Sequence, residues 1–180
     1  MHRKRLLIQW LGHSDLRALA ANSTASRQQR ILATVGGKLP QPDDLGPTKT
    51  LLTTQKFDQI RLLSNYTADF NNWFAAWLGV KAEIVPVQLQ GPTNYAEIFS
   101  VTSSQLESLR AGKSRTELEL CLHLSPGTPA MTAVWLLLGK TRYPATFYET
   151  HGGRSWITTV PFDLIDVIPE VLRDSDVHLQ

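Results

Sequence analysis

The segment Ser125-Pro126-Gly127-Thr128-Pro129 has residue types suited to binding a phosphate or another electron-rich group. Thr128 is a good helix N-cap, and Pro129 suits the first helical position because its missing N–H would have no partner there. Gly127 lets the main chain approach a ligand closely. The free N–H groups and the positive end of the helix dipole would then face that ligand. A strand-to-helix turn that is capped for stability alone fits these residues about equally well.

Two further polar segments favour the site over the plain turn. Gly12-His13-Ser14 follows the apolar run 6–10, and Ser64-Asn65-Tyr66 follows the run 59–63. Open parallel sheets bind ligands beyond the carboxyl ends of their strands, so we expect the three segments to share one site. His13 would donate to a phosphate or stack on a base, although an exposed loop histidine is nearly as good an interpretation. The predicted ligand-binding residues are Gly12, His13, Ser14, Ser64, Asn65, Ser125, Pro126, Gly127 and Thr128.

Alternating strands and helices are expected to position these segments. Strands are predicted over residues 6–10, 59–63, 82–87 and 117–124, and helices over 47–55, 68–78, 94–110 and 128–138. Residues 11–15 are expected to form a loop, residues 16–35 are ambiguous apart from a short helix over 28–35, and 143–148 with 156–160 predicts a hairpin around two glycines. The pattern predicts an α/β fold: a Rossmann-like open, mainly parallel sheet with helices on both faces and a C-terminal β-hairpin.

Composition limits the classes of protein and partner. The chain has 180 residues, of which 42% are hydrophobic and 19% charged, and its net charge is +2. This predicts a single globular domain with no electrostatic case for wrapping duplex DNA. Cys121 is the only cysteine, so no internal disulfide can form, and we expect a cytoplasmic location. No apolar stretch has the length of a membrane span, so no membrane partner is expected.

Several catalytic and cofactor motifs are missing from the sequence. No G-x-G-x-x-G opens a helix and no G-x-S-x-G is present, so we expect neither a dinucleotide cofactor nor esterase chemistry. The five histidines lack ligand spacing, so no metal site is predicted. His123 alternates with apolar neighbours and is interpreted as a core histidine. The aromatic residues Phe70, Trp73, Phe74 and Trp77 recur at helical spacing and are also interpreted as core.

The strand 120–124 and the segment 125–132 that follows it resemble the CARF domain, the CRISPR-associated Rossmann-fold sensor. Within that family, the chain looks most like the sensor at the N-terminus of sigma-54-dependent transcription activators, the group that includes the RNA-repair operon activator. The resemblance extends from Leu6 to about Glu170. It implies a homodimer in which strand-end loops of both subunits line one pocket for cyclic oligoadenylates or RNA ends. The matching positions are Gly12, His13, Ser14, Ser125, Gly127 and Thr128, with Asn65 facing the same pocket.

The resemblance also implies partners and a domain organisation. No ATPase module or helix-turn-helix is present, so residues 1–168 are expected to be the sensor of a longer regulator, and residues 169–180 the start of a linker to ATPase and DNA-binding domains. We expect a non-catalytic nucleotide or RNA sensor. The alternative is a ring nuclease that uses His13, Ser14 and Thr128 to orient a 2′-hydroxyl for in-line attack, although no acid–base pair is evident. A dimerisation module without a ligand is the third class.

Overall fold

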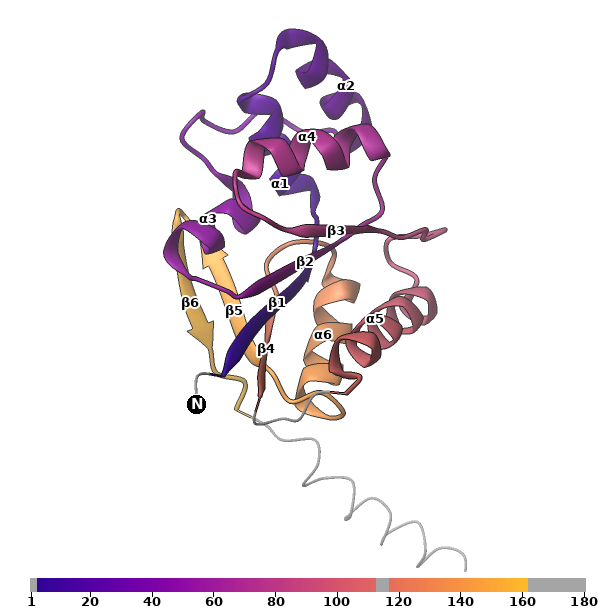
Figure 1. Ribbon diagram of the computed structural model, residues 1–180. Coiled ribbons are helices and arrows are strands. Elements are labelled where there is room, and N and C mark those ends of the chain that lie inside the picture. The colour runs from indigo at the N-terminus through magenta and orange to yellow at the C-terminus, as the bar shows by residue number, and fades with distance from the viewer. Residues whose placement is uncertain (1–2, 113–116, 162–180) are drawn as a thin grey trace, which may run out of the picture.

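One mixed sheet organises the described part of the chain (Figure 1). The computed structural model describes residues 3–112 and 117–161. Its strands are β1 (Lys4–Trp10), β2 (Gln59–Ser64), β3 (Glu83–Pro86), β4 (Leu118–His123), β5 (Thr146–His151) and β6 (Arg154–Thr158). They lie in the order β3-β2-β1-β4-β5-β6. All neighbours are parallel except β5 and β6, which are antiparallel. The predicted Rossmann-like, mainly parallel sheet with a C-terminal hairpin is confirmed.

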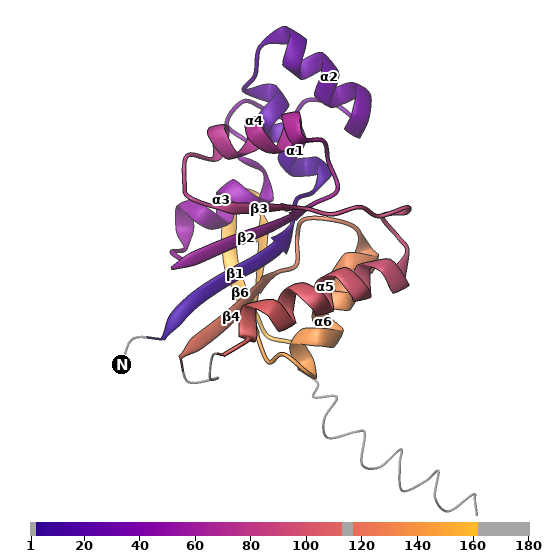
Figure 2. The same ribbon diagram turned by 45° about the vertical axis from the view of Figure 1, so that its right-hand side comes forward.

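Helices cover both faces of this sheet, as predicted. They are α1 (His13–Ala21), α2 (Ala25–Val35), α3 (Gly46–Thr54), α4 (Ala68–Leu78), α5 (Tyr95–Arg110) and α6 (Pro129–Lys140). Along β1, Leu6 and Ile8 pack with α5 and α6, whereas Leu7 packs with Leu51 of α3. Figure 2 shows α5 and α6 side by side on their face. The period-two alternation of a strand therefore feeds two separate cores.

Helix α4 has the bounds predicted from its sequence. It follows Thr67 and ends at Gly79, whose φ of 73° is the left-handed conformation that suits glycine at a helix end. Phe70 and Phe74 are buried, which confirms that part of the aromatic stripe as core. Trp73 and Trp77 are half-buried, and cationic side chains of α2 and α3 lie over their rings.

Two local predictions were wrong. Residues 11–15 do not form a loop, because α1 already begins at His13. The short helix expected over 28–35 lies within α2, and most of the residues before it, which the sequence left ambiguous, belong to α1. The hairpin strands begin and end differently from the expected 143–148 and 156–160, since the turn consists only of Gly152 and Gly153. Both glycines have positive φ, which allows this tight connection. The predicted boundary at residue 168 lies outside the described residues.

The buried polar interior agrees with two smaller predictions. His123 is fully buried with hydrogen-bond partners on both ring nitrogens, so it is a core histidine. Cys121 is also buried, and burial raises the pKa of its thiol to about 12. Within residues 3–112 and 117–161, no group of His, Cys, Asp or Glu side chains is arranged to hold a metal ion. Among the helices of those residues, none combines the length and apolarity needed to span a bilayer.

Candidate functional site

A cavity of about 360 Å³ lies at the carboxyl ends of β1, β2 and β4. All three strand-end segments contribute to it, as their shared position at one edge of the sheet predicted. The predicted site residues that line it are Gly12, His13, Ser14, Asn65, Ser125, Pro126, Gly127 and Thr128. Its other lining residues are Trp10, Leu11, Arg17, Tyr66, Pro92 and Met131. That these residues bind a ligand stays a prediction. Their contacts differ, and only some of them leave polar groups free for a ligand.

Two helices begin at the cavity, and their N-terminal loops touch each other. α1 follows Gly12 and α6 follows Thr128. A Cβ atom on Gly12 would lie 2.7 Å from the main-chain nitrogen of Gly127. Gly127 has a φ of +99°, and its own Cβ would lie 2.8 Å from Sδ of Met131. Glycine at position 12 therefore lets the two loops pack on each other, and glycine at position 127 allows the positive φ beside Met131 of α6. The positive ends of both helix dipoles meet at the cavity.

Thr128 caps α6 as predicted, but its hydroxyl proton is already used. The side-chain oxygen accepts the N–H of Met131 at 3.3 Å, and the hydroxyl donates to the carbonyl of Pro92 at 2.7 Å. Asn65 acts on the same connection, because its Oδ1 accepts the N–H of Leu89 at 3.0 Å. Thr128 and Asn65 thus tie the connection between β3 and α5 to the cavity, where Pro92 forms part of the wall.

The first turns of α1 supply the polar groups that are most available to a ligand. His13 and Ser14 are exposed, and Arg17 is half-buried one turn further on. Arg17 donates to the hydroxyl of Ser14 at 3.3 Å and forms no ion pair with any carboxylate in the described part of the chain. Burial, and then the charge of Arg17, lowers the pKa of His13. His13 is therefore mainly neutral at pH 7, and Arg17 is the cation of the cavity.

Arg17 and Tyr66 were missing from the predicted site. Arg17 lies four residues after His13, so a helix beginning at His13 would have placed both on one face. The sequence left that stretch ambiguous, which hid the relation. Tyr66 stands next to Asn65, and the aromatic side chain beside a polar strand end was the available signal. Its ring centroid lies 6.0 Å from that of His13, at an interplanar angle of 47°.

Ser64 does not line the cavity, unlike the other predicted residues. It is fully buried, and its hydroxyl donates to Oδ1 of Asn71 at 2.5 Å. The hydroxyl oxygen of Ser64 also accepts the N–H of Tyr66 at 3.2 Å. As the last residue of β2, Ser64 turns toward α4 because successive side chains of a strand point to opposite faces. It holds the main chain of Tyr66 in place.

The electrostatics of the cavity favour an anion. No acidic side chain appears among its lining residues. Asp15, in the first turn of α1, is fully buried and accepts the N–H groups of Gly12 and Thr48. Burial raises the pKa of Asp15 to about 6, against the opposing effect of these hydrogen bonds. Burial also raises the pKa of Tyr66, so its phenol stays protonated and is a donor.

Comparison with known proteins finds similarity of fold only. No protein-family model matches the sequence, and no curated protein matches it either. Among solved structures, the chain is similar to Enterococcus italicus Csm6 bound to cyclic hexa-2′-fluoro-hexa-dAMP, with a TM-score of 0.63 and 10% sequence identity. The match covers 97% of this chain and 46% of the Csm6 chain. At this identity, the likeness shows that this chain has the fold of a region spanning less than half of Csm6.

Proposed function

We propose that this chain is a CARF-like ligand-sensing domain that binds a cyclic oligoadenylate, or a related RNA-derived nucleotide, at the cavity beside α1 and α6. The observation that carries the proposal is the convergence of two helix N-termini and the unpaired Arg17 on a cavity without acidic lining. A phosphodiester has the charge and the acceptor oxygens that such a site binds. The Csm6 structure with the same fold contains a cyclic oligonucleotide, which supports this ligand class.

Recognition of the base is proposed for His13 and Tyr66. Their tilted rings lie at the cavity, and Tyr66 keeps its phenolic proton. Aromatic stacking with a base contributes about 1–3 kcal/mol and tolerates any base because each has a π-face. Preference for adenine would then come from hydrogen bonds of the Tyr66 hydroxyl or Ser14.

A homodimer would explain how a small cavity binds a larger ring. Pockets for drug-sized ligands measure about 300–1,000 Å³, so the cavity of about 360 Å³ matches one nucleotide unit rather than a whole cyclic oligonucleotide. A two-fold pair of chains, the commonest oligomer, would offer two such cavities to one symmetric ligand. Light scattering should give twice the chain mass of 20.1 kDa. In the sigma-54 setting that the sequence suggests, the dimer would report to ATPase and DNA-binding domains.

A non-catalytic site is proposed over a ring nuclease. Of the three residues considered for in-line cleavage, Thr128 donates its hydroxyl proton to Pro92, which leaves it no proton for a leaving group. Asp15 is buried and accepts main-chain N–H groups, so it is not placed to take the proton of a 2′-hydroxyl in the cavity. We expect cyclic hexa-adenylate to be recovered intact by chromatography after incubation with the protein. Conversion to linear products would favour the ring nuclease.

The proposal is tested by titration calorimetry with cyclic oligoadenylates, linear oligoadenylates and short RNAs that differ in their terminal phosphates. We expect saturable binding of at least one class, with affinity that falls as salt is raised because phosphates are bound. Duplex DNA of equal charge serves as the control and should bind no more tightly than nonspecifically. If none of the three classes binds or raises the melting temperature at millimolar concentration, the dimerisation module becomes the better description.

A further inference from the structure

A chain of buried polar side chains crosses the sheet beneath the cavity. It starts at the N–H of Gly12, which donates to the carboxylate of Asp15 at 3.1 Å, and this carboxylate also accepts the N–H of Thr48 at 2.8 Å. The side chain of Gln9, on β1, donates from Nε2 to the hydroxyl of Thr48. Gln9, Asp15 and Thr48 have no exposed surface. The first half of the chain therefore joins the α1 loop to α3 and β1 in the interior.

The second half reaches the loop before α6. Oε1 of Gln9 lies 2.8 Å from Nδ1 of His123, and Nε2 of His123 lies 3.0 Å from the hydroxyl of Thr150 on β5. The N–H of Thr150 donates to the hydroxyl of Ser125 at 2.8 Å, and this hydroxyl donates back to the carbonyl of Thr150 at 3.2 Å. The chain thus starts at Gly12 and ends at Ser125, which both line the cavity.

The donors and acceptors along the chain fix its directions. Nε2 of Gln9 donates to Thr48 and to the carbonyl of Trp10 at 3.3 Å, so Oε1 is the acceptor that faces His123. Nδ1 of His123 therefore carries the proton, and Nε2 accepts from Thr150. Burial lowers the pKa of His123 to about 3, so the ring is neutral at pH 7. Every group between Asp15 and Ser125 has a partner, which a buried network needs in order to be stable.

We propose that Gln9 and His123 are positioning residues. They hold the loop before α1, at Gly12, and the loop before α6, residues 125–128, at a fixed separation. Neither side chain lines the cavity, so both act through Gly12 and Ser125. The two loops meet at main-chain contact distance, since no Cβ would fit between Gly12 and Gly127. A small slip between β1 and β4 would therefore change the shape of the cavity directly.

The apolar surroundings distinguish this role from simple filling of the core. Leu7 and Cys121 precede Gln9 and His123 by two residues on the same face of the sheet, and both are buried against Leu51. Apolar side chains evidently suit this layer, and buried polar groups often add little stability over well-packed apolar ones. Hydrogen bonds, unlike apolar contacts, depend on direction and therefore fix the relative positions of the groups that they join. The inference rests on the proposed function, because the fixed separation matters for a ligand held between the loops.

The binding test uses cyclic hexa-adenylate and three variants. Gln9→Met keeps the size of the side chain and removes its hydrogen bonds, and we expect about a tenfold loss of affinity. Gln9→Met/His123→Leu replaces both partners by apolar groups, so stability should recover relative to Gln9→Met while affinity stays low. Cys121→Ala is the matched control on the same face: it should lower stability and keep affinity. Affinity that follows stability across all three variants would overturn the positioning role.

A second test needs no ligand. Thr150→Val keeps the branched shape and removes the hydroxyl that donates to His123, and it lies on the exposed side of the network. We expect the amide resonance of Gly12 and the ring ¹⁵N resonances of His123 to shift in the NMR spectrum. Thr158→Val, which removes a hydroxyl bonded to Glu149 on the same hairpin, should leave the Gly12 resonance in place.

The two tests separate the two proposals. An unmoved Gly12 resonance in Thr150→Val contradicts the positioning network, whether or not an oligoadenylate binds. A shifted Gly12 resonance in a protein that binds no oligoadenylate leaves the network intact and contradicts the proposed ligand class.

Discussion

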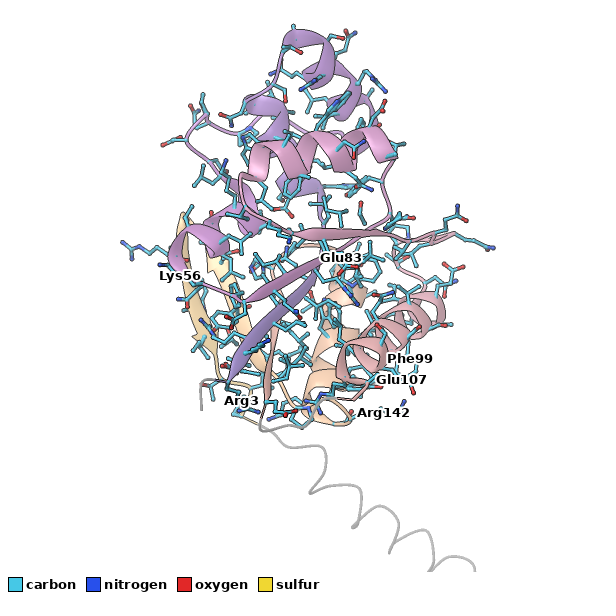
Figure 3. The ribbon with its side chains drawn as sticks, viewed as in Figure 1. Arg3, Lys56, Glu83, Phe99, Glu107 and Arg142 are labelled. Atoms are coloured by element: carbon cyan, nitrogen blue, oxygen red, sulfur yellow. The ribbon has the colours of Figure 1, made fainter. Side chains whose placement is uncertain are left out.

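The sheet has a hollow at each edge, and the smaller one is the better candidate site. The hollow at the amino edge, about 830 Å³, is lined by residues such as Lys56 and Glu83 (Figure 3) and by the last residues of α3 and α5. At least one of its cations is already in an ion pair, because Arg61 lies 2.8 Å from the carboxylate of Glu83. The carboxyl-edge cavity is less than half as large, but α1 and α6 begin there.

Helix polarity, rather than volume, distinguishes the carboxyl-edge cavity as the candidate site for an anion. Helix N-termini present N–H groups and positive partial charge, whereas helix C-termini present carbonyl groups and negative partial charge. An anionic ligand is attracted to the carboxyl edge and gains nothing from the helix ends at the amino edge. Variants in matched pairs, one at each edge, test whether the ligand binds at the carboxyl edge.

The largest effect is expected for the glycine that joins the two loops. Gly127→Ala introduces a Cβ 2.8 Å from Sδ of Met131 at a φ of +99°, so backbone strain and overpacking add to a loss of about 3 kcal/mol in unfolding free energy. Gly79→Ala, beside the amino-edge hollow, has a similar positive φ with open space around the new Cβ. It should lose only about 1 kcal/mol. Equal losses in urea denaturation would show that the main chain at Gly127 is not tightly packed against Met131 and Trp10.

An intermediate effect is expected for the aromatic side chain at the cavity. Tyr66→Leu should weaken oligoadenylate binding by about 1–3 kcal/mol, because the base loses its stacking partner. Tyr66→Phe should retain most of the affinity. The amino-edge counterpart is Phe57→Leu, since Phe57 lines the larger hollow and is covered by the guanidinium of Arg5. Calorimetric titration should find its affinity unchanged, and a loss there equal to that of Tyr66→Leu would place the ligand elsewhere.

The smallest effect concerns pH. Asp15 has a higher pKa in the folded chain than its ordinary value of 3.8, because of burial. The folded state therefore binds more protons than the unfolded state between about pH 4 and pH 6, and the Asp15 contribution to stability falls as pH rises through that range. Asp15→Asn removes this contribution. The stability of the natural chain relative to Asp15→Asn should thus be higher at pH 4.5 than at pH 7, by about 1–2 kcal/mol.

His123 acts in the opposite direction and must be kept in both proteins of that comparison. Its pKa is lowered by burial, so the unfolded state binds the extra proton and stability falls as pH drops below about 6.5. Thermal melts of the two proteins across the range isolate Asp15. A relative stability that does not change with pH would show that the Asp15 carboxyl is not held in a desolvated site.

Local signals explain which parts of the site could be predicted from the sequence. Thr128 and Pro129 indicate a helix start by their own chemistry. The alternation of strands and helices along the chain predicts the parallel sheet and therefore its carboxyl edge. The start of α1 was missed because its N-cap is Gly12, which has no side chain to mark a helix start. The carboxylate that accepts the N–H of Gly12 belongs to Asp15, three residues later, and is also bonded to Thr48 of a distant helix. Arg17 was missed as a consequence of that error.

Long-range pairing explains the remainder. The alternation around His123 predicted that it is buried, but its partner Gln9 is 114 residues away in the sequence. Ser64 was expected to face the ligand because it follows the predicted strand 59–63. In the fold it is the last residue of β2, and its hydroxyl bonds to Asn71 of α4. The sequence predicted that the hydroxyl of Thr128 would be available to a ligand. In the fold, this hydroxyl donates to the carbonyl of Pro92. Sequence pattern finds the edge of the sheet, and tertiary contacts decide which groups at that edge are free.

The most direct test of the account compares the cations of the two edges in one titration. Arg17→Gln removes the unpaired cation of the carboxyl-edge cavity, and Lys56→Gln removes an exposed cation of the amino-edge hollow. A hydrogen bond to a charged group contributes about 1.5–3 kcal/mol, so Arg17→Gln should weaken oligoadenylate binding about 10- to 100-fold. Lys56→Gln should leave the affinity within about twofold, since a distant exposed charge is screened by salt. Full affinity in Arg17→Gln together with a loss in Lys56→Gln would contradict the assignment of the site to the edge where α1 and α6 begin.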